Sequence, residues 1–179
     1  MVALPDLGPR ILILGTSNSG KSTLAVALSE RLGVPVVHLD QLRQTPQTDW
    51  EQRPEAEFAA LHDAAIAEPA WVMDGNYAAY MPQRFDRATG AILLSANRWI
   101  RFARYLKRTL RNSRARAGHL DGAKDSVKWS MVHWILVVSP GREQKFARRI
   151  KESGLPHVIC PNPRAVTALY ADWGLTRPT

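Results

Sequence analysis

One short stretch near the N-terminus has the residue types and spacing to bind phosphate groups. It fits the pattern G-x-x-x-x-G-K-[S/T] of a phosphate-binding loop (P-loop) and consists of Gly15, Thr16, Ser17, Asn18, Ser19, Gly20, Lys21 and Ser22, with Thr23 following. Its glycines let backbone N–H groups converge on phosphate oxygens, and the N-terminus of a following helix favours negative charge there. Lys21 would place a cation beside the β- and γ-phosphates, and the Ser22 hydroxyl would ligate Mg²⁺. The pattern predicts that residues 15–23 bind ATP with Mg²⁺.

Two aspartates follow apolar runs that we expect to be strands. Asp40 ends the run 36–40, and Asp74 ends the run 71–74 and begins the sequence Asp-Gly-Asn-Tyr. Open α/β sheets bind ligands at the carboxyl ends of their strands, where a carboxylate can hold Mg²⁺ or accept a proton from a substrate hydroxyl. Aspartate is also common there as a helix cap or turn residue. We expect Asp40 to be catalytic and the phosphoryl acceptor to contact Asp40, Asp74, Gly75, Asn76 and Tyr77.

The positive charge of the chain is concentrated in one segment. The chain has 24 Lys and Arg against 16 Asp and Glu, a net charge of +8, and its pI is about 10.1. From residue 87 to residue 120 there is no acidic residue and there are nine basic ones, whereas the rest of the chain has 15 basic and 16 acidic residues. Such a segment suits a lid that clamps phosphoryl groups, a surface for a nucleic-acid backbone, or a solvated helix face. We favour the lid because the segment follows the fourth predicted strand, and we expect Arg101, Arg104 and Arg108 to be catalytic.

Short apolar runs alternate with helical patterns, which indicates an α/β fold with a mostly parallel sheet. The expected strands are 10–15, 34–39, 71–73, 91–94 and 157–160, and the expected helices are 20–32, one that begins at Pro54, 98–116, 127–138, 142–151 and one that begins at Pro163. Residues 41–53 are polar and resemble a loop. Trp99 and Phe102 lie on the apolar stripe of the helix 98–116, so we expect both in the core. We expect one domain, 1–179, with 97–122 as its arginine-rich lid.

Composition and cysteine count exclude several classes of protein. Cys160 is the single cysteine, so an internal disulfide framework and a cysteine-based zinc site are excluded. The longest apolar run, 134–138, is far shorter than the roughly 18 residues of a membrane span, and the first ten residues have no apolar signal core. We therefore expect a cytoplasmic protein with no membrane partner. The five histidines show no metal-ligand spacing, and His38, two residues before Asp40, is the one placed to reach the site.

Several of these features occur together, in the same order, in one known family. They are the P-loop, the sequence HLDQL at 38–42, the pair DW at 49–50 ahead of a proline-led helix, the sequence WVMDGNY at 71–77 and the arginine-rich helix. In these features the chain resembles bacterial FlaR-type proteins, commonly labelled DNA topology modulation proteins or adenylate-kinase-related kinases. These belong to the P-loop kinases of the adenylate and shikimate kinase group. The resemblance covers nearly the whole chain from Arg10 onward.

The resemblance implies a five-stranded parallel sheet of order 2-3-1-4-5, ATP as phosphoryl donor, and lid arginines between Arg101 and Arg111. In that topology Asp74 looks like the Walker B acid, which serves Mg²⁺ together with Ser22. Asp40 resembles the acid that related small-molecule kinases direct at the acceptor and the metal. The sequence departs from the family after the fourth strand, where residues 94–98 read LSANR and lack the expected Asp and Pro. The resemblance supplies no acceptor.

The sequence thus favours an ATP-dependent phosphotransferase of the adenylate and shikimate kinase-like group that acts on a nucleotide or another small acceptor. The alternative is a nucleotide-binding regulator that contacts DNA or RNA through the arginine helix. For the phosphotransferase we expect Lys21→Ala and Arg101→Ala to lower turnover far more than they lower fold stability. The oligomeric state is left open.

Overall fold

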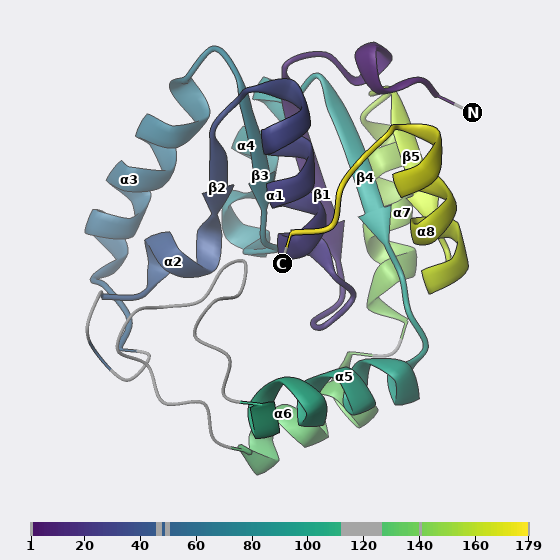
Figure 1. The fold of residues 1–179 in the computed structure, drawn as a ribbon. Coiled ribbons are helices and arrows are strands. Elements are labelled where there is room, and N and C mark those ends of the chain that lie inside the picture. Colours follow the sequence, from purple (N-terminus) through teal and green to yellow (C-terminus); the bar gives the residue numbers. More distant parts are fainter. Residues whose placement is uncertain (1, 46–47, 49–50, 112–126, 140, 179) are drawn as a thin grey trace.

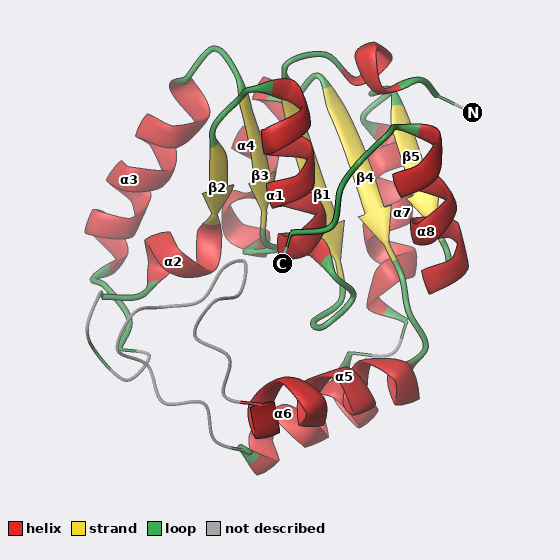
Figure 2. Ribbon diagram, viewed as in Figure 1, coloured by secondary structure: helices red, strands yellow, loops and turns green. Residues whose placement is uncertain are grey.

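The fold is built on a sheet of five parallel strands. A computed structural model describes residues 2–45, 48, 51–111, 127–139 and 141–178 of the chain. The strand order is β2-β3-β1-β4-β5, as the family resemblance implies, so the expected α/β fold is confirmed. Figures 1 and 2 show this sheet with helices on both of its faces. The strands are β1 (Arg10–Gly15), β2 (Val36–His38), β3 (Trp71–Asp74), β4 (Gly90–Leu94) and β5 (His157–Cys160).

The three middle strands are apolar along their length because helices cover both faces of the sheet. Every residue of β1, β3 and β4 is buried except Arg10. A strand between two helical layers has no solvent-facing side, so a continuous apolar run replaces the alternation of a half-exposed strand. The edge strands β2 and β5 are only partly buried.

Two layers of helices cover the sheet, one on each face. In β1, Ile11 and Ile13 pack against one layer, whereas Leu12 and Leu14 pack against the other. The first layer contains α1 (Lys21–Leu32) and α8 (Pro163–Asp172), and the second contains α3 (Glu55–Ala67), α4 (Met81–Arg87) and α7 (Arg142–Glu152). Across the described part of the chain, we find no helix with the length and apolar character that a membrane crossing requires.

The structure contains several short helices that the sequence analysis did not predict. The expected second strand ends early at His38, and α2 (Leu39–Arg43) replaces the beginning of the expected loop. Asp40 therefore lies in the first turn of a helix and not at the end of a strand. The chain turns here because Leu39 is buried in the second core cluster, and this tertiary contact outweighs the local polar composition. The short helices η1 (Leu4–Leu7), η2 (Ala78–Tyr80) and α4 have too few turns to show a period in the sequence.

A separate group of helices lies across the carboxyl ends of the strands, at the end of the sheet to which the arrows in Figure 1 point. The group contains α5 (Arg98–Arg111), α6 (Trp129–His133) and a π-helical turn, η3 (Trp134–Val138). A small apolar cluster around Tyr105, Val132 and Ile135 holds these elements together. Residues 112–122 of the expected lid lie outside the described residues.

The buried face of α5 differs from the predicted apolar stripe. Arg101, Tyr105 and Thr109, which are four residues apart, are buried, whereas Trp99 is 59% exposed. The prediction that Trp99 is a core residue is therefore wrong, while Phe102 packs against the apolar cluster as expected. The helix is rotated so that Arg101 faces the end of η3, where it donates to Ser139 Oγ. Tyr105 faces the segment before α6, where its hydroxyl accepts from the backbone N–H of Lys128.

One buried histidine in α3 makes the stability of the fold sensitive to acid. His62 is fully buried, with its ring 4.9 Å from that of Tyr80, and its Nδ1 lies 2.9 Å from a carboxylate oxygen of Asp63. Burial lowers the pKa of His62 below its ordinary 6.5, against the opposing effect of Asp63. Because the unfolded chain then binds the proton more readily, the stability contributed by neutral His62 is present above about pH 6.5 and is lost as the pH falls below it.

Replacing His62 with a residue that cannot titrate should reduce this acid sensitivity. Between about pH 8 and about pH 5.5, we expect the Tm of the wild type to fall more than the Tm of His62→Gln, measured by circular dichroism. His133→Gln is the control, because His133 is exposed. An equal fall of Tm in the wild type and in His62→Gln would contradict the role of His62.

Candidate active site

The loop between β1 and α1 has the backbone geometry of a phosphate cradle. At Gly15, a Cβ atom would lie 2.2 Å from the carbonyl oxygen of Leu94, and Gly20 has a φ of +104°. Both positions therefore require glycine. The loop leads into Lys21, the first residue of α1, so the free N–H groups of the helix N-terminus point at the space that the loop encloses.

Side chains of this loop fit a bound phosphate. Thr16 Oγ1 and Ser19 Oγ are buried without a hydrogen-bond partner. An unpaired buried hydroxyl costs about 1–3 kcal/mol, and Ser19, which lines the space over the loop, would recover that cost by donating to a phosphate oxygen. Lys21 Nζ donates to the carbonyl oxygen of Thr16 at 3.2 Å, which holds the ammonium group beside the loop. The P-loop thus has the donors and the charge that a bound phosphate group requires.

Asp74 lies at the centre of a polar chain that crosses three elements. Ser22 Oγ donates to Asp74 Oδ2 at 2.7 Å, and His38 Nδ1 lies 2.5 Å from Asp74 Oδ1. Asp74 and His38 are both buried. A serine hydroxyl next to a carboxylate is a donor set that suits Mg²⁺ when phosphate oxygens and water complete the coordination. The structure therefore brings His38 to the site, together with the predicted pair Ser22 and Asp74.

The residues that follow Asp74 join the P-loop to Asp40. Asn76 Nδ2 donates to the carbonyl oxygen of Gly15 at 2.9 Å, and Asn76 Oδ1 accepts from the Gly15 N–H at 3.4 Å. Tyr77 donates its hydroxyl to Asp40 Oδ1 at 2.9 Å. Burial, aided by the negative charge of Asp40, raises the pKa of Tyr77 well above its ordinary value of 10, so the phenol remains a donor at neutral pH. We call residues 74–77 the DGNY loop.

A cavity of about 720 Å³ opens over the P-loop. Asp40, Gln44, Arg104 and Met131 contribute to its lining beside the P-loop residues 17–23. The remaining lining, which we call the C-terminal wall, consists of Pro163, Val166, Thr167, Tyr170 and Arg177. The C-terminal wall could not be predicted, because no sequence pattern in these residues marks them as neighbours of the P-loop.

Arg104 is the arginine of α5 that the structure places at the P-loop. Its Nη1 donates to the carbonyl oxygens of Ser19, at 3.1 Å, and of Asn18, at 3.4 Å. Burial and the nearby positive charge of Arg177 lower the pKa of Arg104 from its ordinary 12.5. A cation at this position can neutralise charge on phosphate groups bound in the loop.

Arg101 lies elsewhere, contrary to the expectation that it faces the site. It is 1% exposed, and it donates from Nη1 to Ser139 Oγ at 2.7 Å and from Nη2 to the carbonyl oxygen of Ile135 at 3.3 Å. It is absent from the lining of the cavity. Its position on the buried face of α5 directs it at η3, so it stabilises the packing of that helix. The side chain of Arg108, the third predicted arginine, lies outside the described residues.

The parallel sheet, the P-loop and the cavity above it together define the P-loop kinase fold. A family model described as an AAA domain matches residues 11–125. This match spans more than half of the chain, so the chain belongs to that family. Among proteins of curated function, none matches the sequence.

Solved structures show the same fold over almost the whole chain. The shikimate kinase from Acinetobacter baumannii in complex with shikimate has a TM-score of 0.56 and 15% identity, covering 91% of this chain and 92% of that chain. A gluconokinase from Sinorhizobium meliloti 1021 has a TM-score of 0.50 and 17% identity, covering 94% and 93%. TT1252 from Thermus thermophilus has a TM-score of 0.51 and 17% identity, covering 92% and 97%. At these identities the similarity shows a shared fold.

The different surroundings of Arg101 and Arg104 predict opposite effects of their substitution. Arg101→Ala removes two buried hydrogen bonds, so we expect it to lower the free energy of unfolding by about 2–3 kcal/mol, whereas Arg104→Ala should lower it by less than about 1 kcal/mol. Urea denaturation measures both values. Titration calorimetry with ATP should show weaker binding for Arg104→Ala. Equal stability losses for the two variants would show that Arg101 is not a structural arginine.

Proposed function

We propose that the protein is an ATP-dependent phosphotransferase whose acceptor is a small molecule with a hydroxyl or phosphate group. The observation that supports this most directly is that one cavity contains the P-loop, Asp40 and Arg104. A donor phosphate held by the P-loop and an acceptor held at Asp40 would then meet in one space. Such positioning, together with charge neutralisation, provides most of the rate acceleration in phosphoryl transfer.

The donor half of the cavity suits ATP. The phosphates would accept from the P-loop backbone, from Ser19 and from Lys21, which line the cavity. Mg²⁺, held by Ser22 and Asp74, would neutralise charge on the β- and γ-phosphates. The C-terminal wall provides apolar and aromatic surface, including Pro163, Val166 and Tyr170, against which the base can pack.

In the proposed reaction, Asp40 holds the acceptor. The acceptor oxygen forms a bond to the γ-phosphorus, the bond from that phosphorus to the β–γ bridging oxygen breaks, and Asp40 accepts the proton of the acceptor hydroxyl. Tyr77 holds one oxygen of the Asp40 carboxylate and so fixes its orientation. Lys21 and Arg104 neutralise the negative charge that develops on the transferring group. We assign residues 97–122 the role of a lid that limits access of water.

The fold neighbours support a small acceptor. Two of them are kinases named for shikimate and gluconate, and the first was solved with shikimate bound. The FlaR-type resemblance points to the same group of P-loop kinases and to the adenylate kinases within it. A hydroxyl-bearing small molecule and a nucleotide are therefore the two acceptor classes to test first.

A second candidate function is nucleic-acid binding through α5. The observation in its favour is that Trp99 is exposed and lies 5.6 Å from the guanidinium carbon of Arg98, which is a pair that can stack on a base and contact a phosphate. Against it, Arg101 and Arg104 of the same helix are directed at η3 and the P-loop. We therefore rank it below the phosphotransferase.

Acceptor-dependent ADP formation tests the proposal. ATP and Mg²⁺ would be incubated with nucleoside monophosphates, nucleosides, sugars, polyhydroxy acids and short DNA. We expect ADP formation to depend on one small acceptor and to fall about 100-fold or more in Lys21→Ala, because the cation beside the transferring group is lost. Lys151→Ala is the matched control, since Lys151 is an exposed lysine in the last turn of α7.

The outcomes separate the two candidate functions. ADP formation that ignores every acceptor, combined with DNA association that weakens steeply with salt, would favour the nucleic-acid-binding alternative. If the loss of activity in Lys21→Ala is fully accounted for by a loss of folded protein, the catalytic role of Lys21 is contradicted.

A further inference from the structure

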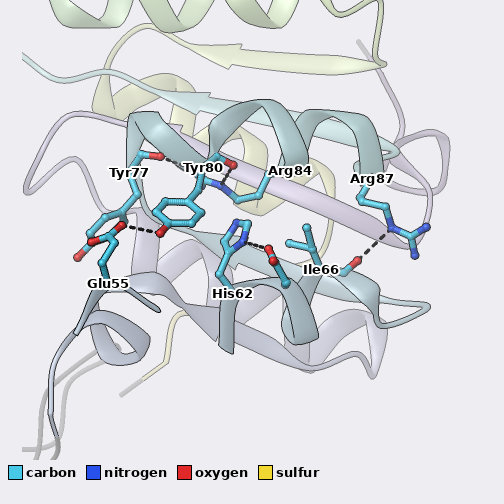
Figure 3. A network of polar contacts seen from close by, with 8 residues as sticks. Glu55, His62, Ile66, Tyr77, Tyr80, Arg84 and Arg87 are labelled. Atoms are coloured by element: carbon cyan, nitrogen blue, oxygen red, sulfur yellow. Dashed lines mark hydrogen bonds and ion pairs between the residues drawn. The ribbon is translucent and has the colours of Figure 1, made fainter. Parts of the chain in front are cut away.

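A buried arginine in α4 bonds to the backbone of the DGNY loop. Arg84 is fully buried, and its guanidinium group donates to the carbonyl oxygens of Gly75 at 2.7 Å, Asn76 at 2.5 Å and Tyr77 at 2.9 Å. Its Nε donates to the carbonyl oxygen of Tyr80 at 3.3 Å. Figure 3 shows the Arg84 side chain directed from its helix toward Tyr77 and Tyr80. One side chain thus bonds to three successive carbonyls of the loop that carries the site residues.

The charge of Arg84 is balanced by these carbonyls. Among the ion pairs of the described residues, none joins Arg84 to a carboxylate. Burial lowers the pKa of Arg84 to about 10, so the group remains charged at neutral pH. Placing an unpaired cation in the interior is costly, and an apolar residue would fill the same space without that cost. What an apolar residue would lack is the planar fork of donors that bonds several carbonyls at once.

The bonded carbonyls belong to the residues whose side chains organise the site. Asn76 bridges to Gly15 at the start of the P-loop, and Tyr77 bonds to Asp40. Tyr77 has a φ of +23°, a backbone conformation that a residue other than glycine adopts at a cost of about 1–3 kcal/mol. Such a conformation persists only when surrounding contacts hold it, and the bonds from Arg84 to the flanking carbonyls provide that restraint.

We propose that Arg84 is a positioning residue of the active site, which aims Asn76 at the P-loop and Tyr77 at Asp40 by fixing the three peptide planes of the DGNY loop. Its place in catalysis rests on the phosphotransferase function proposed above. Its place in the geometry of the site does not, because the contacts to Gly15 and Asp40 are bonds between residues of the chain itself.

The same helix contains a matched control. Arg87 lies three residues after Arg84 and also bonds to backbone carbonyls, with Nε donating to Ile66 at 3.2 Å and Nη2 donating to Ala67 at 3.1 Å. These carbonyls are at the end of α3, and Figure 3 shows Arg87 directed away from Tyr77 and Tyr80. Arg87 therefore anchors one helix to another without touching the DGNY loop.

The test compares Arg84→Lys with Arg87→Lys. Lysine keeps the positive charge but cannot present a planar fork to three carbonyls. For Arg84→Lys we expect kcat to fall about tenfold or more and the acceptor KM to rise, as misaligned reacting groups predict. Arg87→Lys should change both by less than about twofold. The proposal would be overturned if the activity of Arg84→Lys falls only in proportion to its fraction of folded protein, with KM unchanged.

Two measurements remain decisive if the wild type transfers phosphate to no acceptor. Amide hydrogen exchange should rise over residues 74–77 and at Gly15 in Arg84→Lys but not in Arg87→Lys, and ATP should bind about threefold or more weakly only in Arg84→Lys. If neither difference appears, Arg84 has no positioning role, whatever the reaction is. If both appear without transfer in the wild type, the positioning role stands and the phosphotransferase function fails.

A second variant protects the test against poor folding of Arg84→Lys. Asn76→Ala leaves the Arg84 side chain and the loop carbonyls in place but removes the two hydrogen bonds to Gly15. It should reproduce the weaker ATP binding. Unchanged ATP affinity in Asn76→Ala would refute the proposed route from Arg84 to the P-loop.

Discussion

The placement of β3 between β1 and β2 is the constraint on which the site depends. The register pairs Asp74 with Ile13 on one side and with His38 on the other, so the carboxylate meets a serine from the helix after β1 and a histidine from β2. Hydrogen bonds from two sides fix the orientation of the carboxylate. In metal sites generally, such partners orient the side chains that bind the metal. A shift of one residue in this register would turn Asp74 to the opposite face of the sheet and separate the P-loop from the DGNY loop.

Arg84, Arg101 and Arg104 have three different roles because their surroundings in the fold differ. Arg84 organises a loop, Arg101 joins α5 to η3, and Arg104 bonds to the P-loop. Arg84 and Arg101 are fully buried and bond to backbone carbonyls or a hydroxyl. Guanidinium suits such positions because it has five donors in one plane and is more weakly hydrated than an ammonium group. The high positive charge of the segment 87–120 is therefore only in part available to an anionic partner.

The sequence predicted the elements whose signals are local. The P-loop pattern and the five apolar strands were predicted, as were the longer helices α1, α3, α5, α7 and α8, because each depends on neighbouring residues and on a period that the chain repeats. The predictions failed where a distant contact decides the outcome: at Asp40, which a buried Leu39 draws into a helix, and at Trp99, where the buried face of α5 is set by Arg101 and Tyr105. Arg84 was missed because an arginine in a short polar helix resembles any solvated one.

The sequence by itself determined that a phosphate-binding loop joins a buried strand to a helix, and that an Asp-Gly-Asn-Tyr segment follows another strand. Only the tertiary structure decided which arginine reaches the P-loop, that His38 bonds to Asp74, and that the C-terminal wall closes the cavity. The physical reason is the range of the forces involved. Backbone geometry is set mainly by residues adjacent in sequence, whereas the direction and burial of a side chain depend on packing against segments that are distant in sequence.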